Sequence, residues 1–192
     1  NQTTKNVSLL SSGSGGSLGN GHSSTCNSHV NGSYLACSSV SSNGRYVAFS
    51  SQSTNLTSTT NEDRWNVYVK DTQQGTTEIV SISSNGVEGN DNSLGASISG
   101  DGRYVVFESR STNLDAIDTS PQSDVYVHDR NTNTTVLVSR AHNGGVANGN
   151  SGAANISSNG EFIVFQSGSS NLLATSTPTS DNHIYRVRNP LY

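Results

Sequence analysis

The chain has 192 residues, of which 30% are hydrophobic and 12% are charged, and its formal net charge is −4. This length is sufficient for one domain with its own core, and the acidic balance excludes the basic surface with which proteins bind nucleic acid. No apolar run has transmembrane length and no basic-then-apolar leader precedes the first strand-like stretch, so we expect a mature chain that does not insert into a membrane.

The first stretch with strand character is TTKNVSLL at residues 3–10. It matches TTEIVS at residues 76–81, which ends a unit that the chain repeats. We therefore predict a spare strand that pairs with the sheet of another copy. The residues assigned to this assembly strand are Thr3, Thr4, Val7 and Leu9.

Residues 11–37 are expected to form a connection that carries a hairpin insertion between Cys26 and Cys37. The stretch from Val7 to Gly44 is much longer than the equivalent stretch before the next unit, from Val80 to Gly102. This connection therefore contains extra residues. Because these are the only two cysteines and they bracket a stretch that turns at an Asn-Gly pair, we predict a disulfide. Free thiols, or a metal site with His22 and His29 nearby, are the alternatives.

The first repeated unit is expected at residues 38–81, as four short strands. A short strand ends at an Asn-Gly turn that requires positive φ. RYVAFS at residues 45–50 follows, and NVYVKD at residues 66–71 and TTEIVS at residues 76–81 come after polar turns. No stretch between them has helical periodicity, so the strands are predicted to be antiparallel.

The same unit returns at residues 96–139 and, without its last strand, at residues 154–192. Its turn glycines, Gly44, Gly102 and Gly160, are evenly spaced. Several landmarks keep this period of about 58 residues, which indicates an internal duplication. A four-stranded antiparallel sheet repeated in this way is typical of a β-propeller blade.

A Ser-Thr-Asn-Leu or Ser-Ser-Asn-Leu tetrad follows the second strand of each unit and keeps the same period. Its asparagines are Asn55, Asn113 and Asn171. We expect each asparagine to cap a turn by bonding backbone groups, and the leucine after it to lie in the core.

The units resemble the bacterial WD40-like or TolB-type (PD40-like) β-propeller repeats, whose pattern is a DG turn, an aromatic residue, VAF or IAF, and a D-V/I-Y/F-V strand. Here the pattern reads NGRYVAF with NVYV and DGRYVVF with DVYV. The resemblance covers nearly the whole chain and implies an all-β fold of three four-stranded antiparallel blades in a single repeat domain, residues 1–192. It implies no particular activity, because propellers include binding modules, scaffolds and enzymes.

The predicted strand order leaves one spare strand before blade 1 and one missing strand after blade 3. In closed propellers such an offset lets the first strand complete the last blade, but three blades are too few to close a ring. We therefore expect a homo-oligomer that forms by strand exchange, as a head-to-tail filament. The alternatives are a six-bladed homodimer, or a propeller fragment, that binds a glycan or protein ligand.

No nucleophile elbow, P-loop or zinc-protease motif occurs, so we predict no catalytic or cofactor-binding residue and no enzyme activity. His128 is expected on a solvated face of its strand. Clustered carboxylates suit calcium, and the only such candidate site consists of Asp115, Asp118 and Asp124. Because the other two units do not keep this acidic pattern, no cofactor is expected.

The surface chemistry favours an extracellular or cell-surface location. Hydroxyl and amide side chains replace the Lys and Glu that are common on cytosolic proteins, and a disulfide would fit the same compartment. Six N-x-S/T triplets are candidate N-glycosylation sites, although several are expected by chance in such a sequence. They are at Asn1, Asn6, Asn31, Asn55, Asn133 and Asn155.

Overall fold

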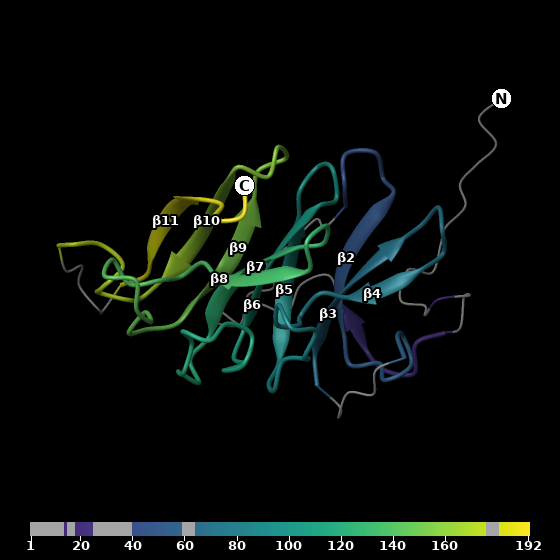
Figure 1. Cartoon of the computed structure of the whole chain (residues 1–192), viewed down its shortest axis with the longest axis horizontal. Helices are drawn as coiled ribbons and strands as arrows, with labels where there is room; N and C mark the ends of the chain where they lie inside the picture. The colour runs from purple at the N-terminus through teal and green to yellow at the C-terminus, as the bar shows by residue number, and fades with distance from the viewer. Residues whose placement is uncertain (1–13, 15–17, 25–39, 59–63, 176–180) are drawn as a thin grey trace.

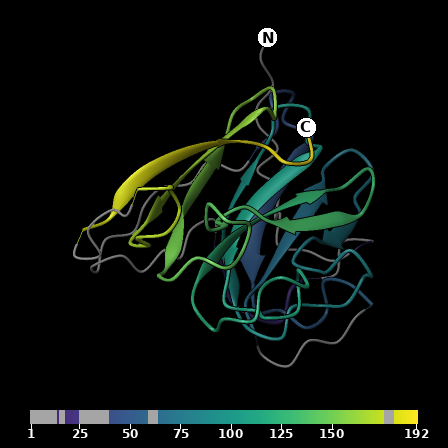
Figure 2. The ribbon, with the colours of Figure 1, turned by 60° about the vertical axis from the view of Figure 1, so that its left-hand side comes forward.

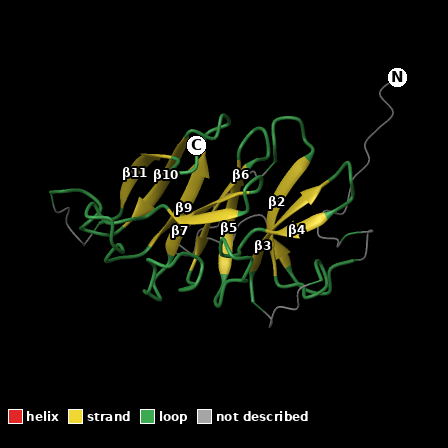
Figure 3. Cartoon of the chain, viewed as in Figure 1, coloured by secondary structure: helices red, strands yellow, loops and turns green. Residues whose placement is uncertain are grey.

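The computed structural model describes residues 14, 18–24, 40–58, 64–175 and 181–192. These residues form three antiparallel sheets that follow one another along the long axis of the molecule (Figures 1 and 3). Within the described ranges there is no helix, and hence none that could span a membrane. The prediction of an all-β chain with three propeller-type blades is confirmed.

Each sheet corresponds to one repeated unit and keeps the same strand order. Blade 1 consists of β1 (Ser23–Ser24), β2 (Tyr46–Ser51), β3 (Asn66–Asp71) and β4 (Thr77–Ile79). Blade 2 consists of β5 (Ser93–Ile98), β6 (Tyr104–Ser109), β7 (Asp124–Asp129) and β8 (Thr134–Leu137). Blade 3 consists of β9 (Ser151–Ile156), β10 (Phe162–Ser167) and β11 (His183–Arg188).

The two central strands of every blade pair in the same register. Tyr46 is opposite Asp71 in blade 1, and Tyr104 is opposite Asp129 in blade 2. In blade 3, Phe162 is opposite Arg188 at the end of β11. Side-chain alternation fixes this register, because a slip of one residue would move every core side chain to the opposite face.

The inner strand of blade 1 differs from the sequence-based expectation. Ser23 pairs with Ser51, as Ser93 pairs with Ser109 in blade 2, so inner-strand residues already lie within the predicted connection. More residues separate Ser23 from Gly44, the turn glycine of blade 1, than separate Ser93 from Gly102, the turn glycine of blade 2. The extra residues of blade 1 therefore follow Ser24 in the sequence, before the described residue Val40.

Apolar side chains pack in layers between neighbouring blades. The three sheets lie side by side (Figure 2). One cluster joins β2 and β3 to β5, β6 and β7, and a second joins β6 and β7 to β9, β10 and β11. A stacked ring pair recurs in each blade with centroids 5.7–5.8 Å apart. Because these clusters bury both faces of blade 2 and one face each of blades 1 and 3, a single unit would have no neighbouring blade to cover either face.

The tetrad asparagines bond backbone groups as expected, but the groups are distant in sequence. Asn113 Oδ1 accepts from the Asn90 N–H at 2.9 Å, and its Nδ2 donates to the Glu88 carbonyl at 2.8 Å. Asn55 and Asn171 make the same pair of bonds in blades 1 and 3. Each asparagine thus fastens the loop after the second strand to the segment before the inner strand.

We expect Asn113→Ala to lower the free energy of unfolding by about 1–3 kcal/mol, because two backbone groups lose their partner. Denaturant unfolding followed by fluorescence measures this loss. Asn131→Ala is the matched control, since Asn131 is exposed and its side chain makes no hydrogen bond within the described ranges. Equal losses for the two variants would contradict the conclusion that the hydrogen bonds of the Asn113 side chain stabilise the fold.

Candidate functional site

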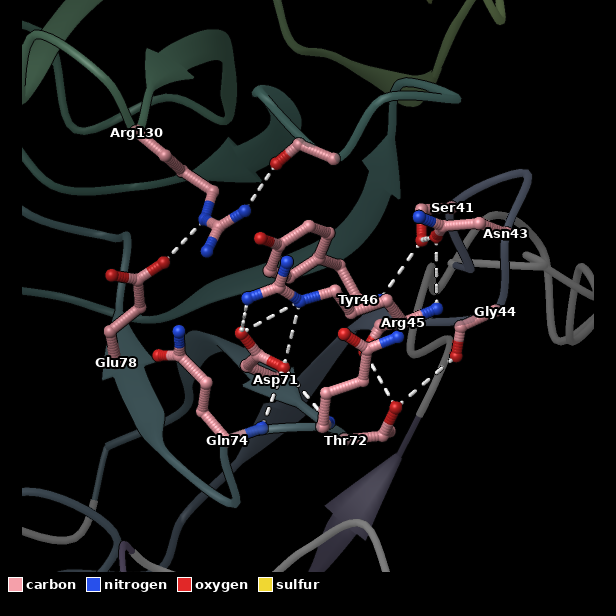
Figure 4. Close-up of polar contacts among 12 residues, drawn as sticks. Ser41, Asn43, Gly44, Arg45, Tyr46, Asp71, Thr72, Gln74, Glu78 and Arg130 are labelled. Atoms are coloured by element: carbon pink, nitrogen blue, oxygen red, sulfur yellow. Dashed lines mark hydrogen bonds and ion pairs between the residues drawn. The ribbon is translucent and has the colours of Figure 1, made fainter.

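A charged pair joins the start of the second strand to the end of the third strand in blade 1 (Figure 4). The Arg45 guanidinium donates from Nε to both Asp71 carboxylate oxygens at 3.0–3.1 Å and from Nη2 to Oδ2 at 2.7 Å. The backbone N–H groups of Gln73 and Gln74 donate to Asp71 Oδ1. The hydrogen bonds from Arg45 are the main cause that lowers the pKa of Asp71 to about 2.

The pair recurs in the other blades, with its charges exchanged in the third. Arg103 and Asp129 repeat the geometry in blade 2, with a shortest contact of 2.7 Å. In blade 3 the acidic partner is Glu161 on the second-strand side and the basic partner is Arg188, 3.6 Å apart. This position therefore keeps an ion pair in every blade, whatever the order of the charges.

The aromatic residue after the first arginine connects the blades. Arg45 lies over the Tyr46 ring at 4.8 Å, and Arg130 of blade 2 lies over the same ring at 4.3 Å. Arg130 also bonds the Glu78 carboxylate of blade 1 and the Gly102 carbonyl (Figure 4). Tyr46 is thus covered by a guanidinium from its own blade and by one from the next blade.

Two turn glycines complete this contact. A Cβ at Gly102 would lie 2.2 Å from the Tyr46 ring, and a Cβ at Gly160 would lie 2.7 Å from the Tyr104 ring. In the second of these contacts the Tyr104 hydroxyl also donates to the Leu191 carbonyl of blade 3 at 2.9 Å. Each interface between blades therefore places an aromatic ring of one blade on the turn glycine of the next.

The third sheet has an open outer edge in the part of the chain that the structure describes. In blades 1 and 2 the strands β4 and β8 pair with the outer edges of β3 and β7. No described strand takes the equivalent place beside β11. An unpaired strand edge presents a row of backbone donors and acceptors to which another strand can be added.

The three acidic residues of the calcium candidate are each engaged with other groups. Asp115 Oδ2 accepts from the Leu137 N–H and from Arg140. Asp118 accepts from the Tyr126 hydroxyl and is 1% exposed. Among the residues with described positions, no three His, Cys, Asp or Glu side chains are placed to hold a metal ion.

The third member of that set, Asp124, is fully buried. Its Oδ1 accepts from the Ser139 hydroxyl at 2.6 Å, while Oδ2 has no hydrogen-bond partner. Burial raises the pKa of Asp124 to about 7. Asn66 occupies the equivalent place in blade 1, where Ser81 donates to its Oδ1 at 2.8 Å, so the site requires a hydrogen-bond acceptor rather than a charge.

The expectation that His128 lies on a solvated face is wrong. The side chain is 2% exposed, and its Nδ1 lies 2.8 Å from the Thr135 hydroxyl on β8. Burial lowers its pKa to about 4. Strand β7 is buried along its whole length, because the neighbouring blades cover its faces and β8 covers its outer edge, so a polar residue in this strand does not mark a surface.

Several predicted site residues lie outside the described ranges. These are the assembly strand with Thr3, Thr4, Val7 and Leu9, the cysteines Cys26 and Cys37, and the glycosylation candidates Asn1, Asn6 and Asn31. Of the remaining candidates, Asn133 and Asn155 are exposed, and the exposed Asn55 uses its side chain in the loop contact above.

The ion pair and the ring-on-glycine contact were not recognised in the sequence. Arg45 and Asp71 are 26 residues apart, as are Arg103 and Asp129, and the pair recurs with the period of the turn glycines. In an antiparallel hairpin the start of one strand lies opposite the end of the next, so this spacing was the available signal.

The sheets and their repeated contacts define a protein built of propeller-type blades. No protein-family model matches the chain, and no curated protein sequence does. Solved structures with similar coordinates include a protein assigned as TolB from Agrobacterium tumefaciens (13% identity, TM-score 0.49), TolB from Acinetobacter baumannii (17%, 0.47) and the tricorn protease (12%, 0.47).

These similarities cover 79%, 81% and 82% of this chain but only 44%, 30% and 13% of the respective structures. The chain thus spans less than half the length of each of them. At this level of similarity, the assignment of the fold depends on the three sheets themselves.

Proposed function

We propose that this chain is a non-catalytic, extracellular structural protein of the TolB-type repeat class that assembles head-to-tail by strand donation into a surface filament. The observation that carries the proposal is the open outer edge of β11, beside which no described strand pairs. The donor is the segment of residues 3–10 of another copy, whose sequence matches that of the strand in the equivalent place in blade 1.

The location outside the cell is supported by composition. The chain carries few charged residues and many neutral hydroxyl and amide side chains, and it holds a single pair of cysteines. Such a surface, together with a disulfide, suits a durable fibre in an oxidising compartment.

A closed ring of two chains is the second candidate. It uses the same donated strand and would present a central mouth to a glycan or protein ligand. Because a head-to-tail contact either closes or propagates, the measured mass separates the two. A species at twice the 20.1 kDa chain mass favours the ring, and a broad distribution of larger species favours the filament.

Deletion of residues 1–10 is expected to convert the assembly to single chains, because the outer edge of β11 loses its donor. Size-exclusion chromatography with light scattering measures the mass. Deletion of residues 1–2 alone, which leaves the predicted strand intact, is the control. A synthetic peptide of residues 1–10 is expected to bind the deleted protein. Unchanged assembly after the deletion, or no binding of the peptide, would contradict strand donation.

A further inference from the structure

Each blade has a forward face, which packs on the next blade, and a back face, which packs on the previous one. The forward face of blade 2 includes Tyr104, Val106 and Val125, which are 3%, 0% and 0% exposed. Its back face includes Ile98 and Val105, which are 7% and 0% exposed. These residues show which positions of a unit are buried when the neighbouring blade is present.

The forward face of blade 3 leaves the same positions open. Val164, which corresponds to Val106, is 39% exposed, and Ile184, which corresponds to Val125, is 74% exposed. Phe162 stands where Tyr46 and Tyr104 stand, and no described glycine packs on its half-buried ring.

The back face of blade 1 is open at the complementary positions. Val40, which corresponds to Ile98, is 50% exposed. Gly44 is exposed and has no described atom within 4 Å of the place of its Cβ, whereas Gly102 and Gly160 are buried beneath the rings of the preceding blades. Blade 3 thus has a ring without a glycine, and blade 1 has a glycine without a ring.

Backbone hydrogen bonds also link the turns beside these glycines, and in each bond the earlier blade donates to the next blade. The Ser42 N–H donates to the Gly100 carbonyl at 2.8 Å, and the Gly100 N–H donates to the Ser158 carbonyl at 2.8 Å. Within the described ranges the Ser158 N–H has no acceptor and the Ser42 carbonyl has no donor. The free donor belongs to blade 3 and the free acceptor to blade 1, so one further bond of the same kind would join them.

We propose that the forward face of blade 3 packs on the back face of blade 1 of a second copy, with Phe162 on that copy's Gly44 and the Ser158 N–H bonded to its Ser42 carbonyl. This inference rests on the proposed function and deepens it, because it names the surface that lies beside the donated strand. The two faces are different, so the contact is head-to-tail, and the pair of copies keeps one free face of each kind.

One residue departs from the internal pattern. Arg186 occupies the place of Val69 and Val127, and its guanidinium lies 4.9 Å from the centre of the Phe162 ring. A charge on an otherwise apolar face limits association with unselected partners. Arg186→Val restores the residue of the internal interfaces and is expected to strengthen association several-fold.

Val164→Glu and Val40→Glu test the contact, one on each face. Both positions are exposed in the single chain, so the variants are expected to fold. Each variant alone is expected to associate about 100-fold more weakly, because burying a carboxylate at an apolar contact costs free energy, and for Val164→Glu this cost exceeds the gain from Arg186 on the neighbouring strand. Val87→Glu is the control, since Val87 is 56% exposed and a Cβ at its counterpart in the next unit, Gly145, would have no atom of the neighbouring blade within 4 Å.

A mixture of the two variants gives the sharper result. Val40→Glu keeps an intact blade 3 face and Val164→Glu keeps an intact blade 1 face. The mixture is therefore expected to form a species of two chains, at twice 20.1 kDa by light scattering, which neither variant forms alone. Self-association of either variant at the level of the unaltered chain, or no two-chain species in the mixture, would overturn the inference.

The outcomes separate this inference from strand donation. Unchanged assembly of both glutamate variants, with loss of assembly after deletion of residues 1–10, would overturn the face contact alone. Loss in the glutamate variants, with none after the deletion, would overturn strand donation alone. A chain that stays single under all conditions would overturn both.

Discussion

Gly102→Ala and Gly160→Ala are expected to lower the free energy of unfolding by about 3–5 kcal/mol each, because two separate costs add. Both glycines have a φ of +78°, in the region that side chains disfavour. In addition, a Cβ at either position would lie under 3 Å from a tyrosine ring of the preceding blade, at 2.2 Å for Tyr46 and 2.7 Å for Tyr104. Chemical denaturation of the purified variants measures the loss.

Gly75→Ala and Gly144→Ala are the matched controls. Their φ angles are +71° and +85°, and no atom lies within 4 Å of the place of a Cβ. These variants should lose only the backbone contribution, about 1–2 kcal/mol. Equal losses at all four glycines would show that the ring-on-glycine contact adds nothing to blade packing.

Asp124→Asn is expected to stabilise the protein at pH 8 by about 2–4 kcal/mol. Burial raises the folded-state pKa of Asp124 to about 7, above its ordinary value of 3.8. Between these two pH values the folded state binds the additional proton, so stability declines as pH rises from 4 through 7. Asparagine removes this decline and keeps the acceptor for Ser139, as Asn66 does for Ser81 in blade 1.

Asp71→Asn provides a control with the opposite sign. The pKa of Asp71 is lowered to about 2, chiefly by the hydrogen bonds from Arg45. Its contribution is therefore present above pH 4 and is lost as pH falls toward 2, so this variant should be destabilised at neutral pH. Urea unfolding between pH 2 and 8 measures both curves. A stability of the Asp124→Asn variant that follows the unaltered protein at every pH would contradict the buried carboxyl.

The blades were predictable because their determinants are local and periodic. Alternation in RYVAFS and NVYVKD, and the positive-φ turn at Gly44, each fix a short piece of backbone. Repetition at a constant period then identifies the pieces as one unit. The inner strand of blade 1 escaped prediction because an insertion separates Ser23–Ser24 from the turn, so no continuous stretch carries its pattern.

The site was less predictable because its contacts join distant residues. Tyr46 and Gly102 belong to different units and meet only when two blades pack. The burial of His128 likewise depends on β8, which covers it with the Thr135 hydroxyl. Sequence spacing identifies the positions that recur. The arrangement of the sheets is needed to show which of these positions are in contact across an interface.

The most direct test of head-to-tail association is electron microscopy of the purified chain at the concentration where light scattering shows assembly. We expect unbranched filaments, in which the blade spacing within a chain continues without interruption from blade 3 of one copy to blade 1 of the next. Particles that contain only one chain would contradict the association itself, and closed two-chain rings would contradict the filament.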